Sequence, residues 1–383
     1  MTDSDKILAY LRSSREEMLD FLARLVLAES PSRQPAAQVG PLTILWESLT
    51  ELDFGVEQIT GRVTGGHLLA RDKHAELSPV SAGSQLLIGH CDTVWPMGTL
   101  KVMPLEIGPE VVKGPGVYDM KGGLTQMIFA LRALRELGYR PALQPVVFIN
   151  SDEEIGSVES RPYICELAQE AARAFILEPA LEPGGKLKTA RKGVGRFEVL
   201  VKGRAAHAGL DPESGRSAIL ALSYVIQQLH GLNDPASGVT VNVGLVDGGV
   251  GANVVPPVSK AIVDVRVRTQ SDAALMEERL QQLTTPVPDT TVVVAGAFGR
   301  PPLEATPANR ALWELAQHVG RQVGLELEDG MAGGGSDGSY TSLYTATLDG
   351  LGAVGDGAHA AHEFLYIDKM IERTALLALL LLH

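Results

Sequence analysis

Short apolar runs alternate with longer stretches of helical spacing along most of this chain. Apolar residues recur every three or four positions over about 4–29 and 36–52, as expected for amphipathic helices. Ser14 and Glu17 have the spacing of a capping box, which would divide the first stretch into two helices. Compact apolar runs typical of strands follow at VEQIT, HLLAR, QLLIGH, VVFIN and AFILEP, and helical patterns separate the later ones. This alternation predicts an α/β fold with a mostly parallel sheet flanked by helices.

The rhythm changes between residues 192 and 300. There the order is strand, helix, two strands, helix and strand, with helical patterns over 218–232 and 273–283. This is the order of a split βαβ unit, an α+β fold of the ferredoxin-like kind. The sequence therefore predicts a discontinuous domain of residues 1–191 and 301–383, with a second domain of residues 192–300 inserted into it. The first pattern then resumes with a helix over 308–323, the glycine-rich segment GMAGGGSDGS and a last helix after Asp368.

Polar residues with catalytic potential follow the predicted strands. The buried run that ends at Asn150 leads into two adjacent carboxylates, Glu153 and Glu154. Ligands of open α/β sheets bind beyond the carboxyl ends of the strands, so chemistry is expected there. Two neighbouring carboxylates repel each other unless a cation lies between them or their roles differ; one can hold a metal while the other transfers protons. Further candidates at strand ends or helix starts are His90, Asp119, Glu178 and a histidine of GDGAHAAHEF.

Imidazole and carboxylate groups together suit zinc or a similar divalent ion. Five such groups exceed the needs of one tetrahedral site, whereas two metal ions that share a bridging carboxylate would use all of them. Each residue also has a simpler interpretation: His90 as a packed core side chain, Asp119 as a helix cap and Glu178 as a solvated strand end. Their common placement favours a metal centre.

Composition narrows the class of protein. The 383 residues are 45% hydrophobic and 21% charged, which is typical of a globular enzyme of two or three domains. A net charge of −13 with no basic run opposes binding to nucleic acid or anionic lipid. Two cysteines make no disulfide framework, and the amino terminus lacks a signal-peptide pattern, so a cytoplasmic location is expected. The apolar run 375–382 is too short for a membrane span and is interpreted as a buried last helix.

Five ordered motifs give the chain a family resemblance. They are HCD at 90–92, GPGVYDMKGG around Asp119, SDEEIGS around Glu153, LEP at Glu178 and the late AHAAHEF. Together they resemble the M20 family of dinuclear metallopeptidases, over nearly the whole chain. The resemblance implies that His90 and Glu178 hold one zinc ion, that Glu154 and a late histidine hold the other, and that Asp119 bridges the two.

The resemblance also assigns proton transfer and a choice between histidines. It implies that Glu153 is the general base and that Asp92 orients the ligand imidazole. In the family pattern a glutamate follows the ligand histidine by four positions, and an aromatic and an aliphatic residue come next. His359, with Glu363 four positions later, fits this pattern, whereas His362 does not. His359 is therefore predicted to be the ligand.

Residues 192–300 resemble the family's smaller domain, which forms a homodimer and partly covers the active site. His207 in GRAAHAG matches a histidine that crosses the dimer and stabilises the oxyanion. Asn253 and Arg266 match positions that bind the substrate near its free carboxylate. The likeness is greatest to the glutamate carboxypeptidase branch, where cationic positions matching Lys186 and Arg300 receive a glutamate side chain.

The sequence thus predicts a homodimeric hydrolase with two divalent metal ions per subunit, expected to be Zn²⁺, with Co²⁺ or Mn²⁺ as alternatives. It would release a carboxyl-terminal amino acid, glutamate by resemblance, from a small peptide or an N-acyl amino acid. A dipeptidase, or a deacylase resembling acetylornithine deacetylase or succinyl-diaminopimelate desuccinylase, would use the same metals with another pocket. A non-catalytic protein of this fold would be expected to have lost ligands or the base. Nucleic acid and membranes are not expected partners.

Overall fold

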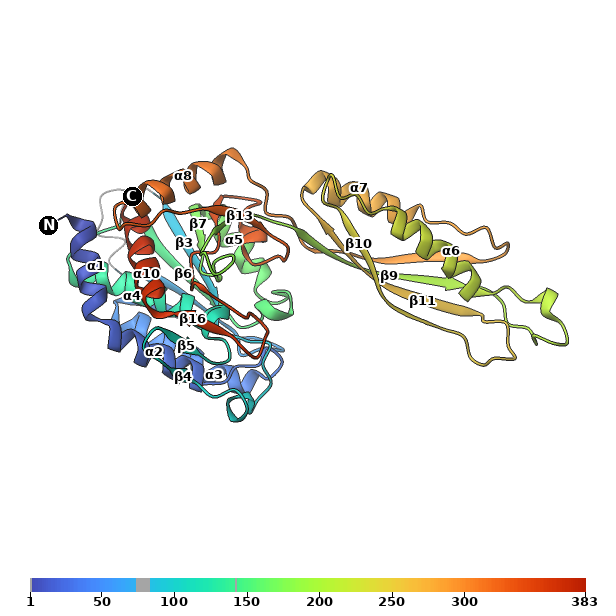
Figure 1. The fold of residues 1–383 in the computed structure, drawn as a ribbon, viewed down its shortest axis with the longest axis horizontal. Coiled ribbons are helices and arrows are strands. Elements are labelled where there is room, and N and C mark those ends of the chain that lie inside the picture. The colour runs from blue at the N-terminus through green and yellow to red at the C-terminus, as the bar shows by residue number, and fades with distance from the viewer. Residues whose placement is uncertain (1, 74–82, 142) are drawn as a thin grey trace. The chain divides into compact units, whose positions relative to one another are not determined.

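The computed structural model describes residues 2–73, 83–141 and 143–383 (Figure 1). The chain divides into two compact units. The larger contains Met1–Ala190, Ala305–Ala332 and Ser336–His383, and the smaller contains Arg191–Glu304 and Gly333–Gly335. Compared with the predicted insertion of 192–300, the smaller unit also includes flanking residues and three glycines of the glycine-rich segment.

A six-stranded sheet forms the centre of the larger unit. Its order is β1 (Phe54–Ile59), β2 (His67–Asp72), β6 (Gln144–Asn150), β3 (Ser84–His90), β7 (Ala171–Ile176) and β14 (Ala346–Leu348). The strands from β6 to β14 pair in parallel, whereas β1 and β2 run antiparallel at one edge. The predicted α/β class is confirmed, with a mixed sheet in place of a purely parallel one.

Alternate residues of the central strands pack into two separate cores. On β3, Leu87 packs in the core that contains α4 (Gly122–Glu136) and α10 (Ile367–Leu382). Its neighbours Leu86 and Ile88 pack in the core beneath α5 (Arg161–Glu170). Successive side chains of a strand point to opposite faces, so a sheet covered by helices on both faces needs the continuous apolar runs seen in the sequence (Figure 1). The helix α10 is buried along 375–381, as its apolar run predicted.

The described part of the larger unit contains five further α-helices. They are α1 (Asp3–Ser13), α2 (Arg15–Leu27), α3 (Pro35–Glu51) and α8 (Pro307–Arg321), and a short α9 (Gly338–Thr341) follows the glycine-rich segment. The predicted break at Ser14 is present, but the predicted capping box is wrong because the Ser14 hydroxyl donates to the carbonyl oxygen of Tyr10 at 3.0 Å. A capping box instead begins α1, between Thr2 and Asp5.

The smaller unit is an antiparallel sheet of order β10-β11-β9-β12 with two helices. In chain order its elements are β9 (Gly193–Lys202), α6 (Ala218–Gly231), β10 (Thr240–Gly248), β11 (Val258–Val267), α7 (Gln270–Gln281) and β12 (Thr291–Arg300). This confirms the predicted split βαβ order. Every second residue of β9, from Phe197 to Val201, is buried in a core of the unit's own. The alternation shows that one sheet face packs on the helices.

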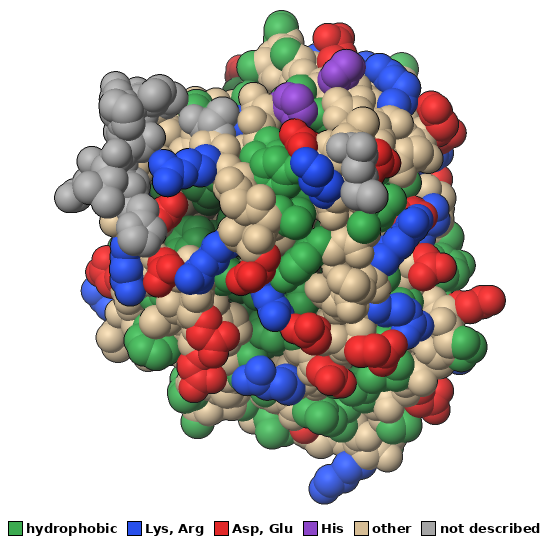
Figure 2. All heavy atoms as spheres, turned by 90° about the vertical axis from the view of Figure 1, so that its left-hand side faces the viewer, with side chains coloured by type: hydrophobic (Ala, Val, Ile, Leu, Met, Phe, Trp, Pro, Cys, Tyr) green, Lys and Arg blue, Asp and Glu red, His purple; other side chains and the backbone are tan. Residues whose placement is uncertain are grey.

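None of the helices in the described part of the chain is long and apolar enough to cross a membrane. On the face drawn in Figure 2, Lys and Arg side chains are interspersed with Asp and Glu. Charges of both signs mixed in this way give a nucleic-acid backbone no concentrated positive field at that face.

Candidate metal centre

Three neighbouring strands carry most of the predicted ligands. His90 is the last residue of β3, Glu154 lies in the turn η4 (Glu153–Ile155) after β6, and Glu178 comes two residues after β7. Because β6, β3 and β7 are parallel neighbours, their carboxyl ends meet at one edge of the sheet. Asp119 reaches the same place from η3 (Val117–Lys121), directly before α4.

His90 presents one ring nitrogen to this edge. The side chain is 1% exposed, and Nδ1 lies 3.0 Å from the carbonyl oxygen of Asp92. A carbonyl can only accept, so Nδ1 donates and Nε2 keeps a lone pair in the neutral ring. That Nε2 faces Asp119 Oδ1 at 3.3 Å and Glu178 Oε1 at 3.4 Å. Acceptor atoms that face one another at such distances are stable only if a proton or a metal ion lies between them.

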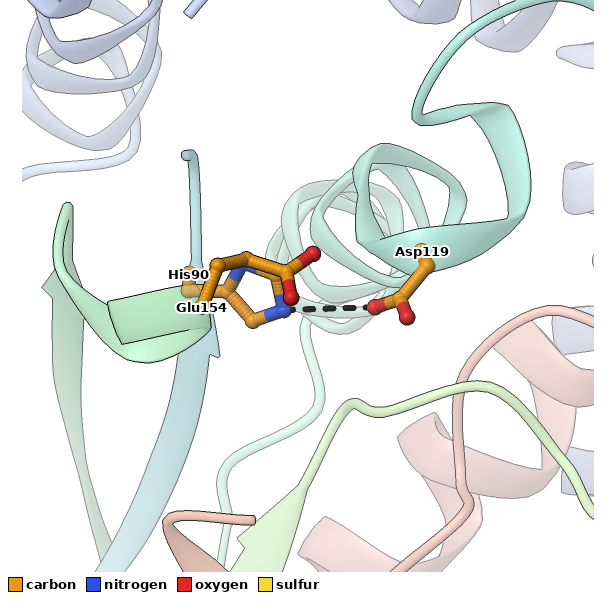
Figure 3. Close-up of side chains that lie close together, drawn as sticks. All are labelled: His90, Asp119 and Glu154. Atoms are coloured by element: carbon orange, nitrogen blue, oxygen red, sulfur yellow. Dashed lines mark ion pairs between the residues drawn. The ribbon is translucent and has the colours of Figure 1, made fainter. Parts of the chain in front are cut away.

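Asp119 lies between two sets of donor atoms. Its Oδ1 faces His90, and its Oδ2 lies 3.5 Å from Nε2 of His359. The same His359 nitrogen is 3.1 Å from Glu154 Oε2. Figure 3 shows His90, Asp119 and Glu154 pointing toward one another from three separate elements. Each carboxylate oxygen of Asp119 thus faces a different histidine.

The donor atoms fit a divalent metal. Two sets, one of His90, Asp119 and Glu154 and one of His90, Glu153 and Glu178, each have ligand atoms within 4.8 Å of one another. A tetrahedral zinc ion with bonds of about 2.0–2.2 Å separates its donor atoms by roughly 3.4 Å, close to the distances above. Among the described residues, His90 Nε2 and Asp119 Oδ1 are buried without a hydrogen-bond partner. These residues could therefore hold a metal ion.

Ionisation in the metal-free site follows from this crowding. Burial raises the pKa of Glu154 to about 7. Hydrogen bonds to Asp119 and Glu154 raise the pKa of His359 to about 10. Burial disfavours the charged form of Asp119, yet its contacts with His359 and His90 hold its pKa below the usual range. Burial likewise opposes the imidazolium of His90, but the surrounding carboxylates raise its pKa well above the usual value. Protons thus take the positions that metal cations would occupy.

Asp92 connects the turn that carries Glu153 and Glu154 to His90 at the end of β3. Its carbonyl orients His90, while its carboxylate oxygens accept the backbone N–H groups of Glu153 and Glu154, each at 3.2 Å. The carboxylate itself lies 3.4 Å from His90 Nδ1, farther than the carbonyl. Sequence reasoning expected only that Asp92 orients the imidazole. In the structure it also positions the turn that carries Glu153 and Glu154, and Glu153 is 9% exposed.

The other predicted site residues lie in different surroundings. Lys186, in the larger unit, pairs with Glu182 at 3.0 Å and Glu328 at 3.6 Å. Arg266, in the smaller unit, pairs with Asp264 through two hydrogen bonds of 2.7 and 3.0 Å. Three more predicted residues belong to the smaller unit: His207, Asn253 and Arg300. None of these five is in the two ligand sets, and their roles toward a substrate stay predictions.

Sequence reasoning missed several supporting residues. Lys188 in β8 (Leu187–Arg191) is 7% exposed, and its Nζ lies 4.0 Å from Glu178 Oε2. Asp337, from the glycine-rich segment, accepts from Asn150 Nδ2 at 2.5 Å and from the Ser157 hydroxyl, and so ties together both ends of the turn that carries Glu153 and Glu154. For Asp337, the signal available in the sequence was an acidic residue within the glycine-rich segment.

Comparison with known proteins identifies the family. The sequence model of peptidase family M20/M25/M40 matches residues 86–383. This chain belongs to that family. It is 30% identical to carboxypeptidase G2 of Pseudomonas sp. (strain RS-16) over 348 residues, which cover 88% of this chain and 82% of that protein. It is 26% identical to a succinyl-diaminopimelate desuccinylase of Wolinella succinogenes, over 76% and 83% of the two chains.

Solved structures agree on the fold. An M20 family metallo-carboxypeptidase from Sulfolobus solfataricus matches with a TM-score of 0.70 at 15% identity and covers 100% of this chain and 99% of its own. Aminopeptidase PepT from Bacillus cereus matches with a TM-score of 0.76 at 19% identity, over 96% and 98%. The chain is therefore a hydrolase of the M20 family, and its sequence relatives include a carboxypeptidase and a desuccinylase.

Proposed function

We propose that this M20 hydrolase cleaves an amide bond and releases a carboxyl-terminal amino acid, glutamate first, from a small peptide or an N-acyl amino acid. The observation that carries the proposal is Asp119, which presents one carboxylate oxygen to His90 and the other to His359. Such a bridge suits two divalent ions held side by side. In this proposal His90 and Glu178 hold one ion, Glu154 and His359 hold the other, and both are zinc, with Co²⁺ or Mn²⁺ as alternatives.

The protein's own groups move the protons. When bound, two divalent ions would polarise the scissile carbonyl and lower the pKa of a water to about 7. Glu153 takes the proton of the attacking water and then delivers it to the leaving nitrogen, since amide cleavage needs a protonated leaving group. Asp92 supports this role because its carboxylate holds the backbone N–H of Glu153.

His207 has the hydrogen bonding of a donor to the oxyanion. Its Nδ1 accepts backbone N–H groups from Gly209 and Leu210, each at 3.1 Å. With Nδ1 as an acceptor, the neutral ring carries its proton on Nε2, and the side chain is exposed. This supports the proposal that His207 donates to the developing oxyanion in the active site of a partner subunit.

The smaller unit has a surface suited to a second copy of the chain. β10 is an edge strand, and its Leu245 and Val246 are exposed. The adjacent helix α6 exposes Ile219, Leu220 and Tyr224. An edge strand with exposed apolar side chains favours strand addition by an identical edge. We therefore propose a homodimer formed through this unit.

Substrate choice is supported by similarity to carboxypeptidase G2. Under this proposal Lys186 and Arg300 receive the glutamate side chain, and Asn253 and Arg266 bind near the substrate's free carboxylate. Lys186 would exchange its two glutamate partners for the substrate's carboxylate. A desuccinylase or another N-acyl amino acid deacylase is the alternative, favoured by similarity to the Wolinella succinogenes protein.

A substrate panel tests the proposal. The protein is stripped of metal, reloaded with zinc, cobalt or manganese, and assayed with acyl-glutamates, acetylornithine, succinyl-diaminopimelate and dipeptides. We expect the highest kcat/KM for an acyl-glutamate, with no turnover before metal is added. Preference for acetylornithine or succinyl-diaminopimelate would replace the carboxypeptidase by the deacylase. Absence of any metal-dependent hydrolysis would overturn the proposal.

A further inference from the structure

Glu363 is a buried carboxylate close to the metal centre that the mechanism above does not use. It is 1% exposed, yet the hydrogen bonds it accepts among the described residues come from no lysine or arginine. Instead it accepts four N–H groups. Oε1 accepts from the backbone of Tyr118 at 2.9 Å and of Asp119 at 3.0 Å. Oε2 accepts from the backbone of Gly116 at 2.8 Å and from Trp95 Nε1 at 2.9 Å.

The four donors come from two segments that flank ligands. Trp95 lies in the loop that follows His90 and Asp92, and residues 116–119 form the turn that presents Asp119. Glu363 itself is four residues after His359 and directly precedes β16 (Phe364–Tyr366). One carboxylate therefore joins the segments that carry His90, Asp119 and His359.

The backbone around residue 116 is shaped for this contact. Gly116 has a φ of +76°, a left-handed conformation that glycine adopts without a steric penalty. Such a residue lets successive N–H groups converge on one anion, as in backbone nests. Pairing of β16 with β5 (Val111–Lys113) holds Glu363 against the turn, since Phe364 pairs with Lys113. The N–H groups of the turn and the pairing of β16 with β5 therefore both fix the position of the Glu363 carboxylate.

A carboxylate that accepts four donors orders the groups that donate to it. Hydrogen bonds to an ionised acceptor are stronger than those between neutral groups. Without Glu363, the buried N–H groups of Gly116, Tyr118 and Asp119 would lack this acceptor, and the turn would rearrange to satisfy them. Any such rearrangement moves the Asp119 carboxylate, whose two oxygens must face His90 and His359 at once.

We propose that Glu363 is a positioning residue for metal binding: its carboxylate orders the 116–119 turn and thereby fixes Asp119 between His90 and His359. The inference rests on the proposed function, because it assumes that these residues bind metal. Glu363 touches neither metal nor substrate in this role. Groups that orient ligands in this way commonly contribute 10–100-fold to metal affinity.

The test is the metal affinity of Glu363→Gln. Glutamine keeps the size of the side chain, but its amide nitrogen only donates, so it would oppose two of the four N–H groups. We expect zinc and cobalt to bind about 10–100-fold more weakly than to the wild type, measured by competition with a chromophoric chelator. The visible spectrum of the cobalt-loaded protein should also change, because the coordination geometry depends on Asp119.

Glu29→Gln is a matched control. The Glu29 carboxylate accepts backbone N–H groups from Gly98 at 2.9 Å and Leu100 at 3.1 Å, just after Trp95 in the chain, and among the described residues its hydrogen bonds include none from the 116–119 turn. We expect Glu29→Gln to lower the thermal stability of the metal-free protein while its metal affinity stays within about twofold of the wild type. A difference in metal affinity between the two variants separates positioning from general stability.

Three other outcomes decide against the inference. If Glu363→Gln lowers stability as Glu29→Gln does but binds metal as the wild type, Glu363 is merely structural. If Glu363→Gln does not fold, Glu363→Asp keeps an ionised acceptor but shortens its reach to the N–H groups of the 116–119 turn, and an unchanged metal affinity in that variant overturns the proposal. If the wild type binds no divalent metal, the proposed function fails and this inference fails with it.

Discussion

Glu153 and Glu154 are adjacent in the sequence but have different neighbours in the structure. Glu154 contacts His359, whereas Glu153 lies in the set that contains His90 and Glu178. Because Glu153 is proposed to act as the base without binding metal, Glu153→Ala should lower kcat by at least about 10²-fold and leave two metals per chain. Kinetics together with elemental analysis of the purified variant check this. The loss of one metal equivalent would mean that the roles of the two glutamates are exchanged.

The choice between the late histidines is tested by a pair of variants. Nε2 of His359 lies 3.1 Å from Glu154 and 3.5 Å from Asp119, whereas His362 is exposed and takes part in no ion pair among the described residues. His359→Ala should therefore remove metal and activity, because a ligand is lost, while His362→Ala should change both little. Metal content after gel filtration is the direct measurement. The opposite ranking would assign the ligand to His362.

Stability of the metal-free protein should fall as the pH rises. The pKa of Glu154 is raised to about 7 from 4.5, and that of His359 to about 10 from 6.5. Between the ordinary and the raised pKa of each group, the folded protein binds more protons than the unfolded chain. The free energy of unfolding therefore falls as the pH rises. Thermal unfolding in the presence of chelator should show a falling Tm from about pH 6 to about pH 9. His359→Ala should flatten the profile, and a Tm that rises over this range would contradict the assignment.

The residues of the site could be predicted from the sequence, but the individual atoms that make each contact could not. The strand ends identified His90, Glu154 and Glu178, and the start of a helix identified Asp119. The structure brings these four together with His359. That the Asp92 carbonyl, rather than its carboxylate, makes the shorter contact with His90 depends on a backbone conformation that no pattern of residue types encodes. Glu363 was used only as a marker of motif spacing, because its four donors lie about 250 residues away in the chain.

At the scale of elements, the approach of α4 to β7 brings ligands together. Gly123, in the first turn of α4, lies against the carbonyl of Leu177, which directly precedes Glu178. A Cβ at Gly123 would overlap that oxygen, so Gly123→Ala should cost about 1–3 kcal/mol of unfolding free energy. It should also weaken metal binding, since α4 follows Asp119 directly.

A second glycine provides the control for this prediction. Gly231 ends α6, and a Cβ there would meet no atom within 4 Å. Gly231→Ala should keep the unfolding free energy or raise it by up to about 1 kcal/mol. Denaturant titrations of both variants give the comparison. Equal stability of the two variants would contradict a close contact between α4 and the end of β7.

Helices and strands could be predicted from the spacing of apolar residues wherever the burial of an element is regular. Continuous apolar runs predicted β3 and β6, and helical spacing predicted α4, α6 and α8. Each pattern indicates which faces of an element are covered. The antiparallel pairing of β2 with β6 was not foreseen, since an apolar run does not state the direction of its neighbour. The helical pattern over 36–52 corresponds to α3, which ends at Glu51 because the chain turns at Leu52 and Asp53.

At the scale of the whole molecule, the proposed homodimer links the smaller unit to the chemistry of the larger one. If His207 acts in the partner's site, a chain with His207→Ala and a chain with Glu153→Ala are each nearly inactive, for different reasons. In a mixed dimer, one site combines an intact Glu153 with the partner's intact His207 and should work, while the other site carries both defects.

Random mixing of the two variants makes half of the dimers mixed, each with one good site of two, so activity should return to about a quarter of the wild type. The background is small, because loss of one oxyanion donor costs about 10²–10³ in rate. The measurement is activity after subunit exchange, with exchange verified by mass spectrometry of differently tagged chains. His207→Ala mixed with wild type serves as the control for exchange itself. If verified mixed dimers stay inactive, His207 serves its own subunit's site or takes no part in the chemistry, and the exposed edge at β10 then has no catalytic consequence.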